Sequence, residues 1–277
     1  MKSQLQLFKD TGIFRLQYPS DLREAVLKAQ SSWNTFWRLQ THIKMNLPYS
    51  NGGTGVGYEL KDGVGSHADR KENFDITVEG SQWLEQHASQ IESMEALQFI
   101  RDAAALVPLL KPSLLEFAQQ VEFELGLAGF ADEVAASDAG IFIRFIHYFG
   151  GREEGEETAT AHVDQSAFTF HLFESDPGLQ CLMYDDRQWE DTPVSGGETV
   201  IFPGMQLQHR SGGALRALAH RVVANGNTRV HGRTSAVCFL QLQQSPRYNK
   251  EFGGRLQEKE PGFNYDMSPE EFSRMFK

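Results

Sequence analysis

Residues 141–148 read Ile-Phe-Ile-Arg-Phe-Ile-His-Tyr, the first of several short apolar runs in the second half of the chain. Turn residues such as Asp176-Pro177-Gly178 and Ser211-Gly212-Gly213 separate these runs. Short apolar runs at this spacing indicate the β-strands of a sandwich or jelly roll. The predicted strands are 141–148, 167–173, 179–184, 198–202, 218–224 and 234–242.

The first half of the chain has a helical pattern instead. Apolar residues recur three and four positions apart within 20–47, which is typical of one buried helix face. The same period predicts helices over 81–104 and 106–127, and Pro108 and Pro112 are expected to break or restart the second one. The sequence therefore predicts a mostly β fold with helical support.

A glycine-rich segment, 48–75, separates the predicted helices. A long loop of this kind is either disordered or functional, for example as a lid over a pocket. We expect one domain over 1–277, in which 1–135 supplies helical support and the lid loop. Residues 136–245 would form the β core, and 246–277 a tail that ends in a short helix.

Composition excludes several classes of partner. The formal net charge is −11, the pI is about 5.3 and no dense basic run exists, which argues against nucleic acid and anionic membranes. No apolar stretch approaches the roughly 18 residues of a membrane span. Cys181 and Cys238 stand alone in apolar runs, so we expect reduced thiols and a soluble, cytoplasmic protein. No sequence feature determines an oligomeric state.

Three separated residues suggest a metal site. His162 and Asp164 are two positions apart, so on or just after a strand their side chains share a face. His220 lies in a later strand-like run. Two histidines and one carboxylate leave adjacent coordination positions open, which suits non-haem Fe(II). A surface or capping pair is the competing interpretation of His162 and Asp164 taken alone.

A second pair suggests an anion site. Arg233 and Ser235 head the last apolar run and share a face by the same period. A guanidinium beside a hydroxyl suits a carboxylate, whose two oxygens the guanidinium can bind together. In isolation, a structural salt bridge would be the more common role for Arg233.

These residues occur within longer motifs in a specific order. The motifs resemble those of the iron- and 2-oxoglutarate-dependent dioxygenases of the isopenicillin N synthase-like group, over residues 8–245. They are Gly57-Tyr58, Lys71-Glu72-Asn73-Phe74-Asp75, Ala161 to Phe170, Pro177-Gly178-Leu179-Gln180 followed by Trp189, and Leu218 to Val222. Met205 departs from this pattern, because the family usually has Asp after the preceding glycine. The retained Asp164 argues against halogenation.

The resemblance implies a double-stranded β-helix (jelly roll) core with an N-terminal helical layer. It implies Fe(II) on His162, Asp164 and His220, with no catalytic residue separate from these ligands. It also implies that 2-oxoglutarate, the co-substrate with O2, binds Arg233 and Ser235. Tyr148 could add a hydroxyl to the same carboxylate, with a core tyrosine as the alternative.

The implied reaction is hydroxylation, desaturation or cyclisation of a small molecule, with release of succinate and CO2. An oxidase of the same fold that does not consume 2-oxoglutarate is one alternative, and a metal-free jelly-roll binding module is another. We expect substrate contacts from Arg144, Tyr58 and Phe74. Arg144 would favour an acidic substrate, with a surface salt bridge as its alternative role. His171 and His209 lack ligand-like partners in sequence, so roles behind the metal site or in the core are expected.

Overall fold

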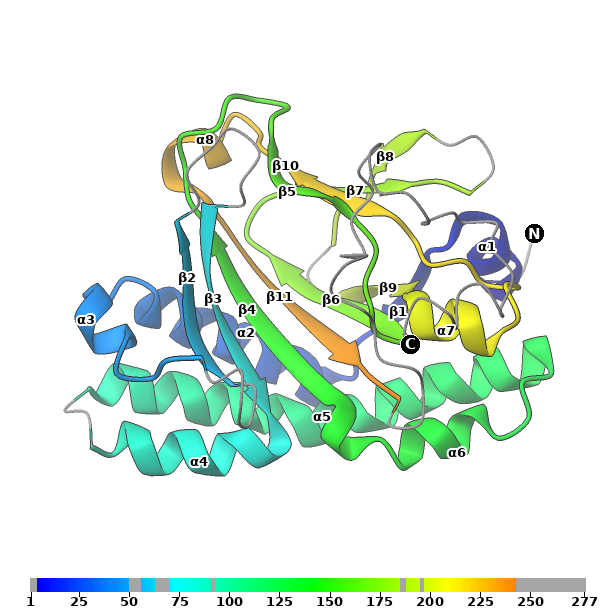
Figure 1. The fold of residues 1–277 in the computed structure, drawn as a ribbon, viewed down its shortest axis with the longest axis horizontal. Coiled ribbons are helices and arrows are strands. Elements are labelled where there is room, and N and C mark those ends of the chain that lie inside the picture. Colours follow the sequence, from blue (N-terminus) through cyan, green and yellow to red (C-terminus); the bar gives the residue numbers. More distant parts are fainter. Residues whose placement is uncertain are drawn as a thin grey trace, which may run out of the picture.

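The computed structural model describes residues 4–49, 56–62, 70–90, 93–184, 188–194 and 197–242. Two antiparallel sheets form its β core (Figure 1). The larger sheet has the order β1-β9-β6-β11-β4-β3-β2 and the smaller one β5-β10-β7-β8, which confirms the predicted jelly roll. The strands are β1 (Phe14–Gln17), β2 (Gly57–Asp62), β3 (Arg70–Thr77), β4 (Ile141–Tyr148), β5 (Glu157–His162), β6 (Phe168–Glu174), β7 (Leu179–Leu182), β8 (Trp189–Asp191), β9 (Glu198–Pro203), β10 (His220–Val223) and β11 (Arg233–Leu240).

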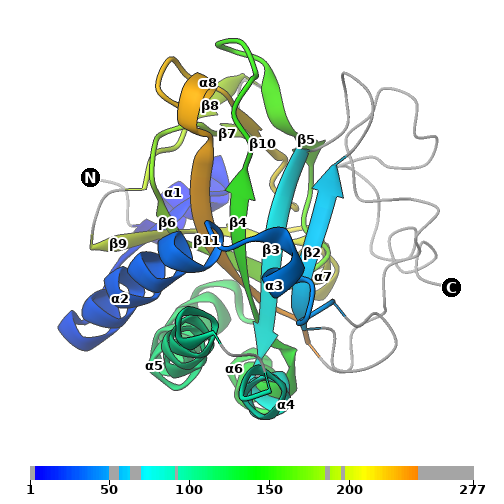
Figure 2. The same ribbon diagram turned by 90° about the vertical axis from the view of Figure 1, so that its left-hand side faces the viewer.

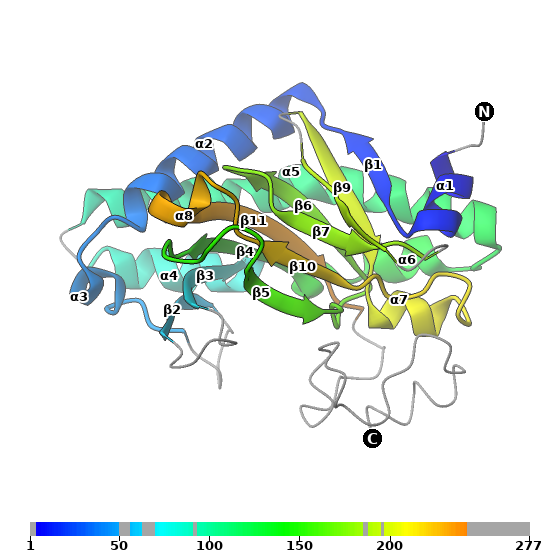
Figure 3. The same cartoon turned by 90° about the horizontal axis from the view of Figure 1, so that it is seen from above.

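Helices cover the outer face of the larger sheet, with α2 and α5 crossing it and α4 alongside (Figure 2). The smaller sheet lies over the opposite face, where β10 crosses above β11 (Figure 3). The helices are α1 (Gln4–Thr11), α2 (Ser20–Phe36), α3 (Thr41–Lys44), α4 (Val78–Ala88), α5 (Met94–Leu125), α6 (Phe130–Ala135), α7 (Met205–Arg210) and α8 (Thr228–His231), with a 3-10 turn at Asp138–Gly140.

Aromatic side chains join the helices to the larger sheet. Phe99 of α5 packs against Phe36 of α2 at 4.8 Å and against Phe145 of β4 at 5.0 Å, measured between ring centroids. All three rings are fully buried. Such rings each bury a large apolar area, so this layer supplies much of the hydrophobic stabilisation of the fold.

Strand periodicity separates the two faces of the larger sheet. Ile143 and Phe145 of β4 belong to the core under the helices, whereas Arg144, Ile146 and Tyr148 face the other sheet and line a cavity. Side chains alternate along a strand with a period of two. This alternation places Arg144 and Tyr148 of β4 inside the jelly roll.

The helical predictions were partly wrong. The segment 20–47 divides into α2 and α3, and 106–127 belongs to one continuous helix, α5, that begins at Met94. Pro108 and Pro112 lie inside α5 on its exposed side. The carbonyls that lose their intrahelical bonds therefore face solvent, and burial of the opposite face holds the helix together.

The prediction of a loop over 48–75 was also wrong for most of its described residues. Gly57–Asp62 and Arg70–Thr77 are strands that pair with each other, and β3 also pairs with β4. Residues 50–55 and 63–69 lie outside the described residues, as does the predicted C-terminal helix. Among the described residues, no helix is long and apolar enough to cross a membrane.

Candidate metal centre and its cavity

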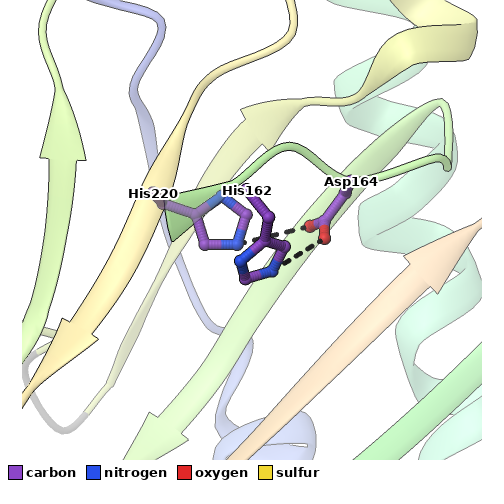
Figure 4. A group of neighbouring side chains, drawn as sticks. All are labelled: His162, Asp164 and His220. Carbon is purple, nitrogen blue, oxygen red and sulfur yellow. Dashed lines mark ion pairs between the residues drawn. The ribbon is translucent and has the colours of Figure 1, made fainter. Parts of the chain in front are cut away.

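His162, Asp164 and His220 come together between the two sheets (Figure 4). His162 ends β5, His220 begins β10, and the two are register partners with ring centroids 4.3 Å apart. One carboxylate oxygen of Asp164 is 3.7 Å from Nε2 of His162, and the other is 3.8 Å from Nε2 of His220. The three candidate ligand atoms all lie within 4.8 Å of one another.

Backbone carbonyls orient both imidazoles. Nδ1 of His162 is 2.7 Å from the carbonyl oxygen of Thr160, and Nδ1 of His220 is 3.1 Å from that of Leu218. A carbonyl can only accept, so Nδ1 carries the proton and Nε2 keeps its lone pair toward Asp164. This is the usual arrangement of metal-binding histidines, in which the second nitrogen donates to a fixed acceptor.

Asp164 is also held in place. Its carboxylate accepts a hydrogen bond from Thr169 Oγ1 at 2.5 Å, and its backbone carbonyl accepts one from the Met205 amide at 2.8 Å. Gly204 passes so close to this loop that an added Cβ would lie 2.2 Å from the carbonyl oxygen of Ser166. A larger residue at 204 would therefore displace the loop that carries Asp164.

The donor set fits Fe(II). Burial, together with neighbouring His220, lowers the pKa of His162 to about 4, so its imidazole is neutral at neutral pH. Neutral imidazole is the form that binds a metal. Two imidazole nitrogens and one carboxylate converge from one side and leave positions open on the other, as in the facial triad of non-haem iron oxygenases.

The anion-site residues line the same cavity as the triad. This cavity has a volume of about 780 Å³, within the range of small-molecule sites. Arg233, Ser235 and Tyr148 all contribute to its wall, and the guanidinium carbon of Arg233 lies 5.9 Å from the ring centroid of Tyr148.

Arg233 is held by the protein at two of its three nitrogens. Nε donates to the carbonyl oxygen of Asp176 at 2.9 Å, and Nη2 forms an ion pair with Glu174. Within the described part of the chain, the buried Nη1 has no hydrogen-bond partner. The salt bridge considered as an alternative is thus present. It leaves Nη1 as the one guanidinium nitrogen without a partner in the described residues, whereas a guanidinium free to bind a carboxylate with two nitrogens was expected.

Arg144 has a partner within the protein and forms a salt bridge with Asp75. Its Nε and Nη2 donate to the two carboxylate oxygens of Asp75 at 2.7 and 2.8 Å. Register causes this contact, because Asp75 of β3 is directly opposite Arg144 of β4. Arg144 still lines the cavity and is 25% exposed.

Tyr58 and Phe74 lie away from the cavity. Both are buried under the helices, where Phe74 packs on Phe36 at 5.3 Å and the Tyr58 hydroxyl donates to Glu72 at 2.6 Å. Their expected position in the pocket was therefore wrong. They lie in strands whose alternation turns these side chains to the helix side.

Sequence reasoning did not identify Thr169 or Glu174 as part of the site. Thr169 donates a hydrogen bond to the carboxylate of Asp164, and Glu174 pairs with Arg233. His171, which sequence reasoning placed behind the metal site or in the core, lines the cavity. Thr169 and His171 are one strand period apart, so an apolar strand with polar residues at alternate positions was the available signal.

Comparisons with known proteins agree with this geometry. Residues 141–242 match the model of the 2OG-Fe(II) oxygenase superfamily. A feruloyl CoA ortho-hydroxylase of Ipomoea batatas is 29% identical over 161 residues, which are 57% of this chain and 41% of that protein. A 1-aminocyclopropane-1-carboxylate oxidase homolog of Arabidopsis thaliana is 32% identical over 118 residues, 42% of this chain and 29% of that protein. The chain thus spans less than half the length of these curated relatives.

Solved structures share the fold. A full-length Neurospora crassa protein in complex with alpha-KG superposes with a TM-score of 0.70 at 18% identity, covering 98% of this chain and 88% of that one. Dioxygenase for auxin oxidation 1 of Arabidopsis thaliana, in complex with 2-oxoglutarate, gives 0.69 at 16% identity, covering 88% and 90%.

Fold and site together define a jelly-roll protein with a two-histidine, one-carboxylate centre. Residues 141–242 match the model of the 2OG-Fe(II) oxygenase superfamily, the kind of family that the motifs predicted.

Proposed function

We propose that this protein is an Fe(II)- and 2-oxoglutarate-dependent dioxygenase that oxidises a small molecule and releases succinate and CO2. One observation carries the proposal. A facial set of candidate ligands lines the same cavity as a buried arginine nitrogen that has no hydrogen-bond partner among the described residues. A metal-chelating 2-oxo acid with a distal carboxylate has groups suited to both.

Each part of the cavity has a separate task. His162, Asp164 and His220 would hold the iron, with Thr169 keeping the carboxylate of Asp164 in place. Arg233 and Ser235 would bind the distal carboxylate, and Tyr148 would add its hydroxyl. Leu179 and Val222 give this wall apolar surface that excludes water. When bound, the iron supplies the O2 chemistry that protein side chains lack.

The primary substrate is proposed to be a small molecule that fits the cavity beyond the co-substrate. Arg144 lines this cavity beside Phe142 and Phe239, whose rings stack at 5.7 Å. An acidic substrate would meet Arg144, although Asp75 already balances its charge.

A cytoplasmic location is proposed from the thiols. Cys181 and Cys238 are both unpaired and buried, and burial raises the pKa of each to about 12. Unreactive, reduced thiols are compatible with a reducing compartment.

Succinate formation tests the proposed reaction. Metal-free protein would be reconstituted with Fe(II), then supplied with 2-oxoglutarate and O2, and succinate measured by mass spectrometry. We expect succinate that depends on all three and increases with a suitable substrate. No succinate from iron-loaded protein under any substrate would contradict the proposal.

An oxidase that does not consume 2-oxoglutarate is the second candidate. The Glu174 carboxylate favours it, because it already balances the charge of Arg233. In such an enzyme Arg233 and Ser235 would bind a carboxylate of the primary substrate. Substrate oxidation without any loss of 2-oxoglutarate would identify this alternative.

A further inference from the structure

His171 of β6 is a buried polar residue that has no role in the proposed reaction as described above. The residue is 3% exposed and lines the cavity. Its Nε2 has no hydrogen-bond partner among the described residues. A buried donor or acceptor without a partner loses the hydrogen bond that water would have given it, which destabilises the protein. Such a group in a cavity wall indicates a place where a ligand supplies the missing bond.

A β-bulge brings His171 to the anion site. Along β6, Phe173 is opposite Ala236 of β11, but the next pair joins His171 to Val237, so Leu172 is the extra residue. In a regular strand, His171 and Glu174 would point to opposite faces, because they are three positions apart. The bulge turns both to the cavity side of the sheet, as bulges near active sites often do.

His171 and Arg233 both lie next to the same carboxylate oxygen of Glu174. Oε2 of Glu174 forms the ion pair with Nη2 of Arg233 and lies 3.6 Å from Nε2 of His171. The latter distance is too long for a hydrogen bond. The other oxygen, Oε1, accepts from the Val194 amide at 2.9 Å. Glu174 is therefore engaged at both oxygens, and among the described residues Nε2 of His171 remains without a hydrogen-bond partner.

We propose that His171 is a further residue of the co-substrate site, whose imidazole donates a hydrogen bond to the distal carboxylate that Arg233 and Ser235 bind. This inference rests on the proposed function and adds a residue that lies outside the motifs described above. The imidazole donates in its neutral form. Burial lowers the pKa of His171 well below its usual value, and Arg233 and His220 lower it further.

Calorimetric titration of the Mn(II)-loaded protein with 2-oxoglutarate and with 2-oxopentanoate tests the inference. The two ligands have the same five-carbon chain and 2-oxo acid end, but 2-oxopentanoate lacks the distal carboxylate. His171→Leu is expected to weaken 2-oxoglutarate binding about 10- to 100-fold, the effect of losing one hydrogen bond to a charged group. Its affinity for 2-oxopentanoate should equal that of the wild type.

Two further variants separate binding from folding. His171→Gln keeps a donor near the position of Nε2, so it should recover most of the 2-oxoglutarate affinity. His231→Leu changes an exposed histidine of α8 and should alter neither affinity. Equal weakening of both ligands in His171→Leu would show a structural role only.

The result for the wild type keeps the two proposals apart. If the wild type binds 2-oxoglutarate and His171→Leu binds it equally well, the role of His171 is wrong and the proposed function is unaffected. If the Mn(II)-loaded wild type binds no 2-oxoglutarate, the proposed function itself is contradicted.

Discussion

Two buried charge clusters lie on opposite faces of the larger sheet and differ in how completely they are paired. On the helix side, Glu72 accepts hydrogen bonds from Lys44, Tyr58 and His147. On the cavity side, Arg233 pairs with Glu174, yet Arg233 Nη1 and His171 Nε2 have no partner in the described structure.

This difference separates a structural cluster from a binding site. A buried carboxylate with three donors stabilises the packing of α3 against β2, β3 and β4, and a ligand could add little to it. Buried nitrogens without partners stay costly until a ligand arrives. Changes to the Glu72 cluster should therefore reduce stability, whereas changes on the cavity side should reduce function.

The largest functional effect is expected at the metal ligands. His162→Ala, Asp164→Ala or His220→Ala should each abolish iron binding and turnover. The free energy of unfolding should change by no more than about 1–2 kcal/mol, because the hydrophobic core does not depend on the metal. Metal content after anaerobic loading and chemical denaturation measure the two effects. A variant that kept both iron and turnover would show that the ligand assignment is wrong.

The largest effect on stability is expected at Glu72. Glu72→Gln should lower the free energy of unfolding by about 3–5 kcal/mol, because Lys44 becomes a buried cation without a counter-charge. Turnover per folded molecule should stay near that of the wild type. Glu85→Gln, which removes an exposed pair with Arg101, is the matched control and should cost at most about 1 kcal/mol. An equal cost in both variants would contradict a structural role for the Glu72 cluster.

Arg233 should have a large effect on co-substrate affinity. Arg233→Ala should weaken 2-oxoglutarate binding by about 2–5 kcal/mol, since the distal carboxylate loses its charged partner. Arg233→Lys should recover only part of this, because an ammonium group cannot replace the guanidinium contacts to Asp176 and Glu174. Calorimetry measures the dissociation constant of 2-oxoglutarate in both variants. Unchanged 2-oxoglutarate affinity with impaired binding of the primary substrate would favour the oxidase alternative.

Acid should act on the helix-side cluster. Burial raises the pKa of Glu72, but the donors His147, Lys44 and Tyr58 outweigh it, so the pKa falls below its usual 4.5. The resulting stabilisation is present above pH 4.5 and is lost as the pH falls through the lowered pKa. Between pH 6 and about pH 3, the free energy of unfolding should fall less steeply in Glu72→Gln than in the wild type. Identical slopes of the free energy of unfolding against pH in both proteins would show that Glu72 does not cause the acid sensitivity.

Arg144 is expected to have the smallest effect. If it contacts an acidic group, Arg144→Gln should raise KM for acidic substrates roughly tenfold, about 1.5 kcal/mol, and leave neutral ones unchanged. The double variant with Asp75→Asn avoids leaving a buried carboxylate without its cation. A panel of acidic and neutral substrates measures the difference, and equal KM changes across the panel would remove Arg144 from substrate recognition.

The sequence predicted features that local pattern determines. The run 141–148 is β4 with the same bounds, and the predicted His162, Asp164 and His220 do come together in one cluster. Strands β2 and β3 were not predicted, because glycine and charged residues in a sequence are typical of a loop. Their strand structure comes from pairing with each other and of β3 with β4.

Contacts between strands could not be predicted in the same way. The pairing of Arg144 with Asp75 depends on the register of β3 against β4. Glu174 lies close to both Arg233 and His171 because of a bulge at one residue of β6. A one-residue change in register would turn these side chains to the other face, so their roles follow from the tertiary fold alone.

Turnover of 2-oxoglutarate to succinate, compared per folded molecule between Asp164→Ala and Glu72→Gln, tests the central claim most directly. Both variants remove one buried carboxylate, on opposite sides of the same sheet. We expect Fe(II)- and O2-dependent succinate at close to the wild-type rate in Glu72→Gln and none in Asp164→Ala. Succinate formation by Asp164→Ala, or its equal loss in both variants, would contradict the assignment of the cavity side as the catalytic site.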